Sequence, residues 1–271
     1  MSFSVIKHGE LIPSDILETV SQRNLAIAKA VNKEFWETSI NQNHNFFVGS
    51  YGRGTAIDDS DIDILVWLPQ EDYMRFDQLK GNGQSRLLQS VKDAIGTTYP
   101  NTEIKADGQV VVLNFSDGMK IEVLPAFVER NSLGVTFKYP DTNQGGKWRS
   151  TDPLAEQSAM RDKNKSSNGL LFDTCKHIRR MHLDCFGSYP LSGIVIDSFV
   201  YEAMKNWQWT PPGQKPNPSA ISYESSLLKY YNDITINGLI DFQIQAPGSG
   251  MNVDSSDSYK CLGKILNKMV E

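Results

Sequence analysis

The stretch FFVGSYGRGTAIDDSDIDILVW, residues 46–67, contains an apolar segment, a glycine-rich turn and a second apolar segment. The turn begins with Gly49 and Ser50, and Asp61 and Asp63 stand at the start of the second apolar segment. Short runs of β-branched and aromatic residues bounded by Gly, Asp and Ser are typical of β-strands. We therefore predict strands over residues 45–48 and 62–68, joined by a polar turn.

The aspartates of this stretch predict a site for a divalent cation. Successive side chains of a strand point to opposite faces, so Asp61 and Asp63 are expected on one face. The apolar residues that alternate with them are expected in the core: Ile62, Ile64 and Val66. Carboxylate oxygens suit Mg²⁺, which usually keeps positions open for substrate phosphates. The Gly49-Ser50 turn adds backbone amides and a hydroxyl that suit an anion.

The spacing of these residues resembles that of a known superfamily. Gly49-Ser50, ten intervening residues and Asp61-x-Asp63 at the head of a strand are similar to the motif of polymerase-β-type nucleotidyltransferases. In that superfamily a third carboxylate comes from a later strand of the same sheet, and Glu122, between Ile121 and Val123, is the candidate.

The sequence around Glu122 narrows the resemblance. Glu-Val-Leu-Pro-Ala, residues 122–126, is similar to the corresponding strand of animal oligoadenylate synthases and of the bacterial enzymes grouped with cyclic GMP–AMP synthase as CD-NTases. Many members carry Asp where this chain has Glu122, which is one methylene longer. The resemblance implies an α+β fold: a polymerase-β-like lobe with a mixed sheet and a long N-terminal spine helix, plus a mainly helical C-terminal lobe. It also implies a catalytic lobe over residues 1–150 and a helical lobe over residues 151–271 that closes the nucleotide cleft.

Local patterns predict the remaining elements. Apolar periodicity indicates a long helix over residues 15–37, with Ser14 as its cap. The other elements expected before residue 126 are a helix over 76–97 and strands over 103–106, 109–115 and 119–125. Asp117-Gly118 is a hairpin signal, so the last two strands should pair.

The second half of the chain has a different residue pattern. Residues 139–153 are rich in Pro, Gly, Asn and Asp and predict a linker, and the pattern after residue 154 is mainly helical. A helix over residues 168–184 would place Lys176, Arg179 and Arg180 on one polar side. In the resembled family a cation on the equivalent helix reaches the triphosphate, which makes Lys176 and Arg179 candidates. The alternative is that this cluster is the solvated side of an amphipathic helix.

The resemblance implies a function and its residues. The function is that of a Mg²⁺-dependent nucleotidyltransferase, with Mn²⁺ as a substitute ion, that joins ribonucleoside triphosphates into a cyclic di- or trinucleotide and releases pyrophosphate, as in bacterial antiphage signalling. The catalytic and metal-binding residues would be Asp61, Asp63 and Glu122. The nucleotide-binding residues would be Gly49, Ser50, Arg53, Lys176 and Arg179. Regulatory or effector proteins of the same defence system would be its partners.

Two alternatives stay open. The acceptor of the nucleotide could instead be a protein, an RNA 3′ end or a small molecule. A different class altogether is a nucleotide-sensing module without turnover.

Composition agrees with a globular enzyme acting on small substrates. The chain has 271 residues, of which 39% are apolar, and that is ample for packed cores in two lobes. The net charge of −5 argues against binding to long nucleic acid, because proteins that bind long nucleic acid usually present a basic face. No secretory leader or membrane span is evident, and three cysteines form no disulfide framework, so a cytosolic location is expected.

Overall fold

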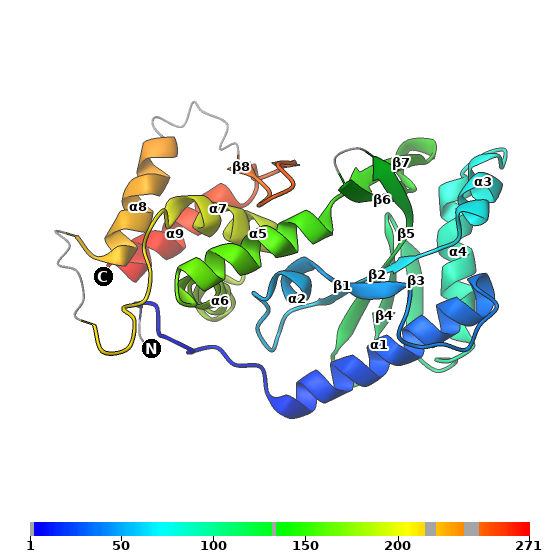
Figure 1. Cartoon of the computed structure of the whole chain (residues 1–271), viewed down its shortest axis with the longest axis horizontal. Helices are drawn as coiled ribbons and strands as arrows, with labels where there is room; N and C mark the ends of the chain where they lie inside the picture. The colour runs from blue at the N-terminus through cyan, green and yellow to red at the C-terminus, as the bar shows by residue number, and fades with distance from the viewer. Residues whose placement is uncertain (1–2, 132–133, 215–220, 236–243) are drawn as a thin grey trace. The chain divides into compact units, whose positions relative to one another are not determined.

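The computed structural model describes residues 3–131, 134–214, 221–235 and 244–271 (Figure 1). The chain forms two compact units. The sheet unit comprises Pro13–Gly52 and Asp59–Leu154, and the helical unit comprises Met1–Ile12, Arg53–Asp58 and Ala155–Glu271. The α+β class is therefore confirmed. The division at residues 150 and 151 stays a prediction about domains, and the structure adds that a short segment before Asp61 belongs to the helical unit.

A mixed sheet forms the centre of the sheet unit. Its strands are β1 (Asn45–Val48), β2 (Ile62–Trp67), β3 (Glu103–Asp107), β4 (Val110–Asn114), β5 (Lys120–Asn131), β6 (Gly134–Asp141) and β7 (Lys147–Thr151). The order β1-β2-β5-β4-β3 is extended by β6, which pairs with β5, and by β7, which pairs with β6. The pair β2–β5 is parallel, and the other pairs in the sheet are antiparallel. The hairpin predicted at Asp117-Gly118 is confirmed, since β4 and β5 pair across it.

Helices α1 (Ser14–Phe35), α3 (Gln70–Asp77) and α4 (Gly83–Gly96) complete the core of the sheet unit. Helix α1 contacts β2 and α4, and α4 contacts β3 and β4, so both cover the same side of the sheet (Figure 1). The long spine helix is confirmed, although Ser14 is its first residue and the N-cap position is Pro13, which makes no side-chain capping hydrogen bond. The alternation in β2 is also confirmed, because the side chains of Ile62, Ile64 and Val66 are buried in this core.

Two sequence predictions for this unit are wrong. The helix expected over residues 76–97 is broken between α3 and α4, because Gly81 takes a positive φ of 88° and the Asn82 side chain caps α4 at Ser85 N. The linker expected over residues 139–153 is largely strand: β6 and β7 pair with the sheet, and only a tight turn with Gly145 and Gly146 at positive φ separates them. The Pro, Gly, Asn and Asp residues of this segment correctly predicted the turn, but they did not predict the strands on either side of it.

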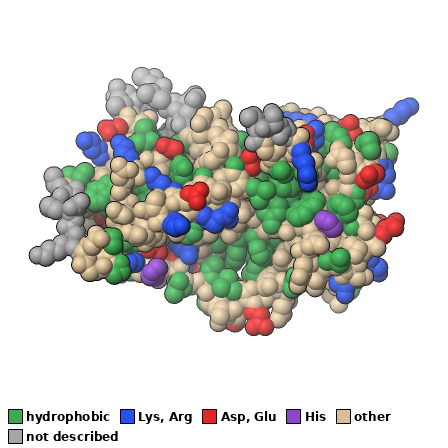
Figure 2. Space-filling model, viewed as in Figure 1, with side chains coloured by type: hydrophobic (Ala, Val, Ile, Leu, Met, Phe, Trp, Pro, Cys, Tyr) green, Lys and Arg blue, Asp and Glu red, His purple; other side chains and the backbone are tan. Residues whose placement is uncertain are grey.

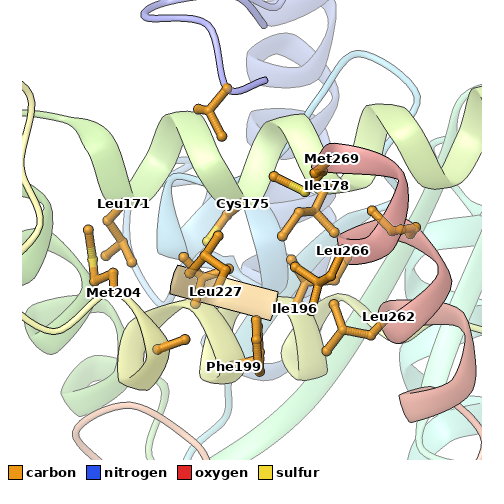
Figure 3. Close-up of a cluster of buried hydrophobic side chains, with 14 of the residues drawn as sticks. Leu171, Cys175, Ile178, Ile196, Phe199, Met204, Leu227, Leu262, Leu266 and Met269 are labelled. Atoms are coloured by element: carbon orange, nitrogen blue, oxygen red, sulfur yellow. The ribbon is translucent and has the colours of Figure 1, made fainter. Parts of the chain in front are cut away.

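The helical unit is built around a separate apolar core. Its helices are α5 (Pro153–Ser166), α6 (Leu170–Met181), α7 (Gly193–Ala203), α8 (Tyr223–Ile234) and α9 (Tyr259–Met269), with the short helix α2 (Gly49–Arg53) ending at its boundary. One π-helical turn, His182–Phe186, follows α6, and a two-stranded ribbon pairs β8 (Ile244–Gln245) with β9 (Asn252–Val253). Figure 3 shows Cys175 and Ile178 of α6 facing Phe199 of α7 and Leu266 of α9.

In the described part of the chain, no helix is both long enough and apolar enough to span a bilayer. Cys175 and Cys261 are buried, Cys185 is exposed, and all three are free thiols.

Candidate active site

The register of two parallel strands brings Asp63 and Glu122 together. Asp63 on β2 and Glu122 on β5 are Cα partners in the ladder. Their neighbours along the strands, Ile62, Ile64, Ile121 and Val123, are almost completely buried on the side covered by α1 and α4. Since alternate residues point to opposite faces, both carboxylates lie on the other side of the sheet, next to each other. The apolar core thus determines where the acidic pair stands.

Gly49 allows the start of α2 to approach this pair. Val48 pairs with Asp63, and the chain then enters α2, whose second residue is Ser50. Gly49 has a φ of +57°, and a Cβ atom added to it would lie 1.9 Å from Asp63 Oδ2. The Asp63 carboxylate therefore lies directly against the Gly49 backbone, which only glycine permits. The structure brings together Gly49, Asp63 and Glu122 as the sequence predicted, with Ser50 one residue away.

Lys120 lies among the predicted carboxylates but was not itself predicted as a site residue. Its Nζ lies 2.9 Å from Asp61 Oδ2 and 2.7 Å from Glu122 Oε1. The hydrogen bonds that Lys120 donates to the carboxylates of Asp61 and Glu122 raise the pKa of Lys120 despite its partial burial, so the ammonium stays charged. The available signal was its position two residues before Glu122 on one strand, which places both side chains on the same face.

The acidic cluster fits a cation. Within the described residues, no three His, Cys, Asp or Glu side chains are arranged to hold a metal ion. However, a positive charge already lies between Asp61 and Glu122, because the Lys120 ammonium bridges them. The side chains of Asp61 and Glu122 are 53% and 27% exposed, so the position is open to solvent. All acidic donors there are carboxylate oxygens, which suit Mg²⁺ or Mn²⁺ and not a soft metal.

The other predicted nucleotide ligands lie in the helical unit, where two of them are engaged with buried partners. Arg53 donates to Asp197 Oδ2 at 2.8 Å and to Glu156 Oε2 at 3.1 Å. Arg179 donates to both carboxylate oxygens of Asp197. Arg179 is only 8% exposed, so the interpretation of a solvated helix side does not hold for it. Lys176 is half-buried, and its Nζ lies 3.4 Å from the Glu10 carbonyl oxygen.

Comparison with protein families identifies the chain. The family model described as Second Messenger Oligonucleotide or Dinucleotide Synthetase domain, SMODS, matches residues 10–164. This match spans more than half of the sequence and contains Gly49, Asp61, Asp63 and Glu122. The chain belongs to this family. The SMODS match confirms the predicted family and makes the protein a nucleotidyltransferase of the oligonucleotide-synthesising class. None of the curated proteins has a sequence that matches it.

Solved CD-NTase structures share the fold of this SMODS protein. The Elizabethkingia meningoseptica CdnE cyclic dinucleotide synthase, solved with GTP and Apcpp, superimposes with a TM-score of 0.62 at 15% identity, over 98% of this chain and 94% of that chain. The Rhodothermus marinus CdnE c-UMP-AMP synthase gives a TM-score of 0.59 at 14% identity, over 96% of each chain. The Bradyrhizobium diazoefficiens CD-NTase CdnG, solved with GTP, gives 0.54 at 12% identity, over 96% of this chain and 86% of that chain. The polymerase-β-like fold is therefore confirmed.

Proposed function

We propose that this SMODS protein is a Mg²⁺-dependent nucleotidyltransferase that joins ribonucleoside triphosphates into a cyclic di- or trinucleotide and releases pyrophosphate. The observation that carries the proposal is the register of β2 and β5, which sets Asp63 beside Glu122, with Gly49 closed against Asp63. Asp61 and Lys120 complete a charged cluster at the same end of these strands.

In this proposal Asp61, Asp63 and Glu122 hold the divalent cations, which would supply charge neutralisation for the triphosphate and a more acidic acceptor hydroxyl. The residues of the chain orient the reactants. Ser50 and neighbouring backbone amides bind the terminal phosphates, and the Lys120 ammonium would give up its place beside Asp61 and Glu122 to the cations. The acceptor oxygen forms a bond to the α-phosphorus, the bond to the bridging oxygen breaks, pyrophosphate leaves, and the hydroxyl proton passes to solvent.

The other predicted nucleotide-binding residues have different roles in this proposal. Lys176 keeps the role of triphosphate ligand, since its ammonium makes only a long hydrogen bond to a backbone carbonyl among its described contacts. Arg53 and Arg179 would have to break ion pairs with Asp197 to reach a phosphate, at a cost that is high for buried charges. We therefore propose that these two arginines act on the site indirectly.

A cyclic product is supported by the family description and by the neighbours in fold, which include a cyclic dinucleotide synthase and a c-UMP-AMP synthase. The charge distribution agrees with small substrates. Basic and acidic side chains are intermixed on the face shown in Figure 2, whereas a protein that follows a nucleic-acid backbone usually presents a basic track. An E. coli CdnC, similar in fold at a TM-score of 0.57 and 12% identity over 96% of this chain and 82% of that chain, was solved with a HORMA protein. A regulatory protein partner and a role in antiphage signalling are part of the proposal.

The experiment is a primer-free reaction of the purified chain with labelled ATP, GTP, CTP and UTP and Mg²⁺ or Mn²⁺. The expected product resists phosphatase and has the mass of a cyclic di- or trinucleotide. The Asp63→Asn variant is the control for contaminating enzymes. Label found on a protein, an RNA 3′ end or a small molecule would move the function to the alternative acceptor class. Triphosphate binding without pyrophosphate release would indicate a nucleotide-sensing module.

A further inference from the structure

The segment Arg53–Asp58 connects two parts of the proposed site but belongs to the helical unit. It begins three residues after Ser50 and ends three residues before Asp61. Arg53, Thr55, Ala56 and Ile57 are all less than 9% exposed. A loop between two strands usually runs over the surface, so burial of this one requires partners for its polar groups.

Asp197 of α7 binds two side chains of the segment. This carboxylate is fully buried and accepts hydrogen bonds at Oδ2 from Arg53 Nε at 2.8 Å and from Thr55 Oγ1 at 3.0 Å. Arg179 binds the same carboxylate at 2.7 and 2.9 Å. The terminal nitrogens of Arg179 also donate to the Cys175 and Gly193 carbonyl oxygens. Two arginines thus face two acids, Asp197 and Glu156, inside the helical unit.

Close packing holds the rest of the segment. Gly54 has a φ of +77°, and a Cβ atom on it would lie 2.6 Å from the Phe172 ring of α6. At the far end of the segment, Asp58 forms an ion pair with Arg180, which also binds Glu10 at 3.0 Å. The segment is therefore attached to the helical unit at its start, middle and end.

We infer that Asp197 is a positioning residue for nucleotide transfer, acting through Arg53 and Thr55 on the segment between Ser50 and Asp61. The inference rests on the proposed function for its catalytic consequence. Three residues extend at most about 10 Å, so anchoring the ends of the segment restricts where Ser50 and Asp61 can lie. Buried ion pairs add little net stability compared with apolar packing, but they can specify one geometry. The charges of Arg53 and Arg179 are paired with Asp197 and Glu156 inside this network.

Two matched Thr→Val substitutions test the inference. Thr55 and Thr174 are both completely buried in the helical unit, and each hydroxyl has a buried hydrogen-bond partner: Asp197 for Thr55, and Tyr223 for Thr174. Each substitution keeps the shape of the side chain and removes one hydroxyl. We expect similar decreases in melting temperature, whereas kcat for pyrophosphate release falls about 5- to 10-fold in Thr55→Val only, as expected for a lost bond to a charged acceptor. Thr55→Ser, which keeps the donor, should restore kcat.

The dependence on Asp197 is tested in a double-variant cycle. If Thr55 acts through Asp197, adding Thr55→Val to Asp197→Asn should lower kcat by less than twofold further. Should Asp197→Asn fail to fold, the comparison of Thr55→Val with Thr174→Val decides alone. Equal kcat values for those two variants would overturn the inference.

A second measurement needs no activity. Hydrogen exchange of backbone amides in residues 53–61 should accelerate in Thr55→Val and stay as in the wild type in Thr174→Val. Unchanged exchange in Thr55→Val would overturn the anchoring. If the wild-type chain releases no pyrophosphate, the proposed function fails, while the exchange data still show whether Asp197 holds the segment.

Discussion

The two charged clusters of this protein both pair basic with acidic side chains but differ in exposure. In the sheet unit, Lys120 bridges Asp61 and Glu122, and the three side chains are 27–53% exposed. In the helical unit, Arg53 and Arg179 hold Asp197, and the exposure of these three side chains is 0–9%. An exposed ion pair is worth about 0–1 kcal/mol and exchanges readily for a ligand. A buried pair is costly to break, so it keeps one geometry.

We propose that this difference separates residues that bind a ligand from residues that only position others. In that proposal the exposed cluster releases Lys120 and accepts a divalent cation with little loss of stability. The buried cluster cannot offer its arginines to a phosphate without leaving Asp197 unpaired. Four predictions test whether the division holds, from the largest expected effect to the smallest.

Asp63→Asn should abolish turnover and leave the fold intact. The change keeps the size of the side chain but removes the charge of a proposed metal ligand, so pyrophosphate release should fall by about 10³-fold or more. The melting temperature should change little, because the substitution keeps the volume of this half-buried side chain. Asp107→Asn, at an exposed position on β3 of the same sheet, is the matched control and should keep full activity. An active Asp63→Asn enzyme would show that the exposed cluster does not bind the catalytic cation.

Gly49→Ala should nearly match that loss through backbone geometry alone. The new methyl group would collide with Asp63 Oδ2, which lies 1.9 Å from the Cβ position, and would push the carboxylate or the Ser50 turn away. We expect about a 100-fold loss of kcat and weaker Mn²⁺ binding by calorimetry. Gly118→Ala is the control, because Gly118 also has a positive φ but open space around its Cβ position. Both variants carry the conformational penalty of alanine at positive φ, of about 1 kcal/mol. Equal activity in the two would show that the close approach at Gly49 has no catalytic importance.

The exposed cluster was largely predictable from the sequence, whereas the buried one was not. Alternation along β2 located Asp61 and Asp63, because Ile62, Ile64 and Val66 had to face the core. The Asp-Gly turn indicated the β4–β5 hairpin, which places Glu122 in a paired strand. These features depend on strand periodicity and local turns, which a single sequence displays directly.

The burial of Arg53 and Arg179 depends on Asp197, which is 144 and 18 residues away along the chain. Helical periodicity showed only that Arg179 lies away from the apolar stripe of α6, and it cannot distinguish solvent from a buried carboxylate. Lys120 was missed for a related reason, since its ion pairs with Asp61 and Glu122 become visible only when β2 and β5 are placed side by side. The pairing of β6 with β7 likewise depends on the sheet, whereas the break before α4 follows from two local residues, Gly81 and Asn82.

Acid should weaken the buried cluster in a narrow pH range. Burial alone would raise the pKa of Asp197, but the charges and hydrogen bonds of Arg179 and Arg53 outweigh it and lower the pKa to about 2. A depressed pKa means that the stabilisation is complete above the unfolded value near 3.8 and is lost as the pH falls toward 2. The difference in unfolding free energy between the wild type and Asp197→Asn, measured with urea, should therefore shrink by about 2 kcal/mol between about pH 6 and pH 2. A difference that does not change with pH would show that Asp197 is not held as a buried anion.

Lys120→Met should strengthen cation binding at the exposed cluster. If the ammonium occupies part of the cation position, Mn²⁺ must displace it from Asp61 and Glu122, and removing it leaves three carboxylates without a competing charge. Because the pair is solvent-exposed, we expect only about a three- to fivefold lower Kd for Mn²⁺, equivalent to about 1 kcal/mol or less. Electron paramagnetic resonance of free Mn²⁺ measures this without substrate, and the gain should diminish at high salt. Lys138→Met is the matched control, since Lys138 pairs with Glu129 at 2.8 Å on the same sheet with similar exposure. An unchanged or higher Kd for Mn²⁺ in Lys120→Met would mean that the ammonium and the cation occupy different positions. In that case the exposed ion pairs of Lys120 would be replaced by a cation no more easily than the buried ion pairs of Asp197.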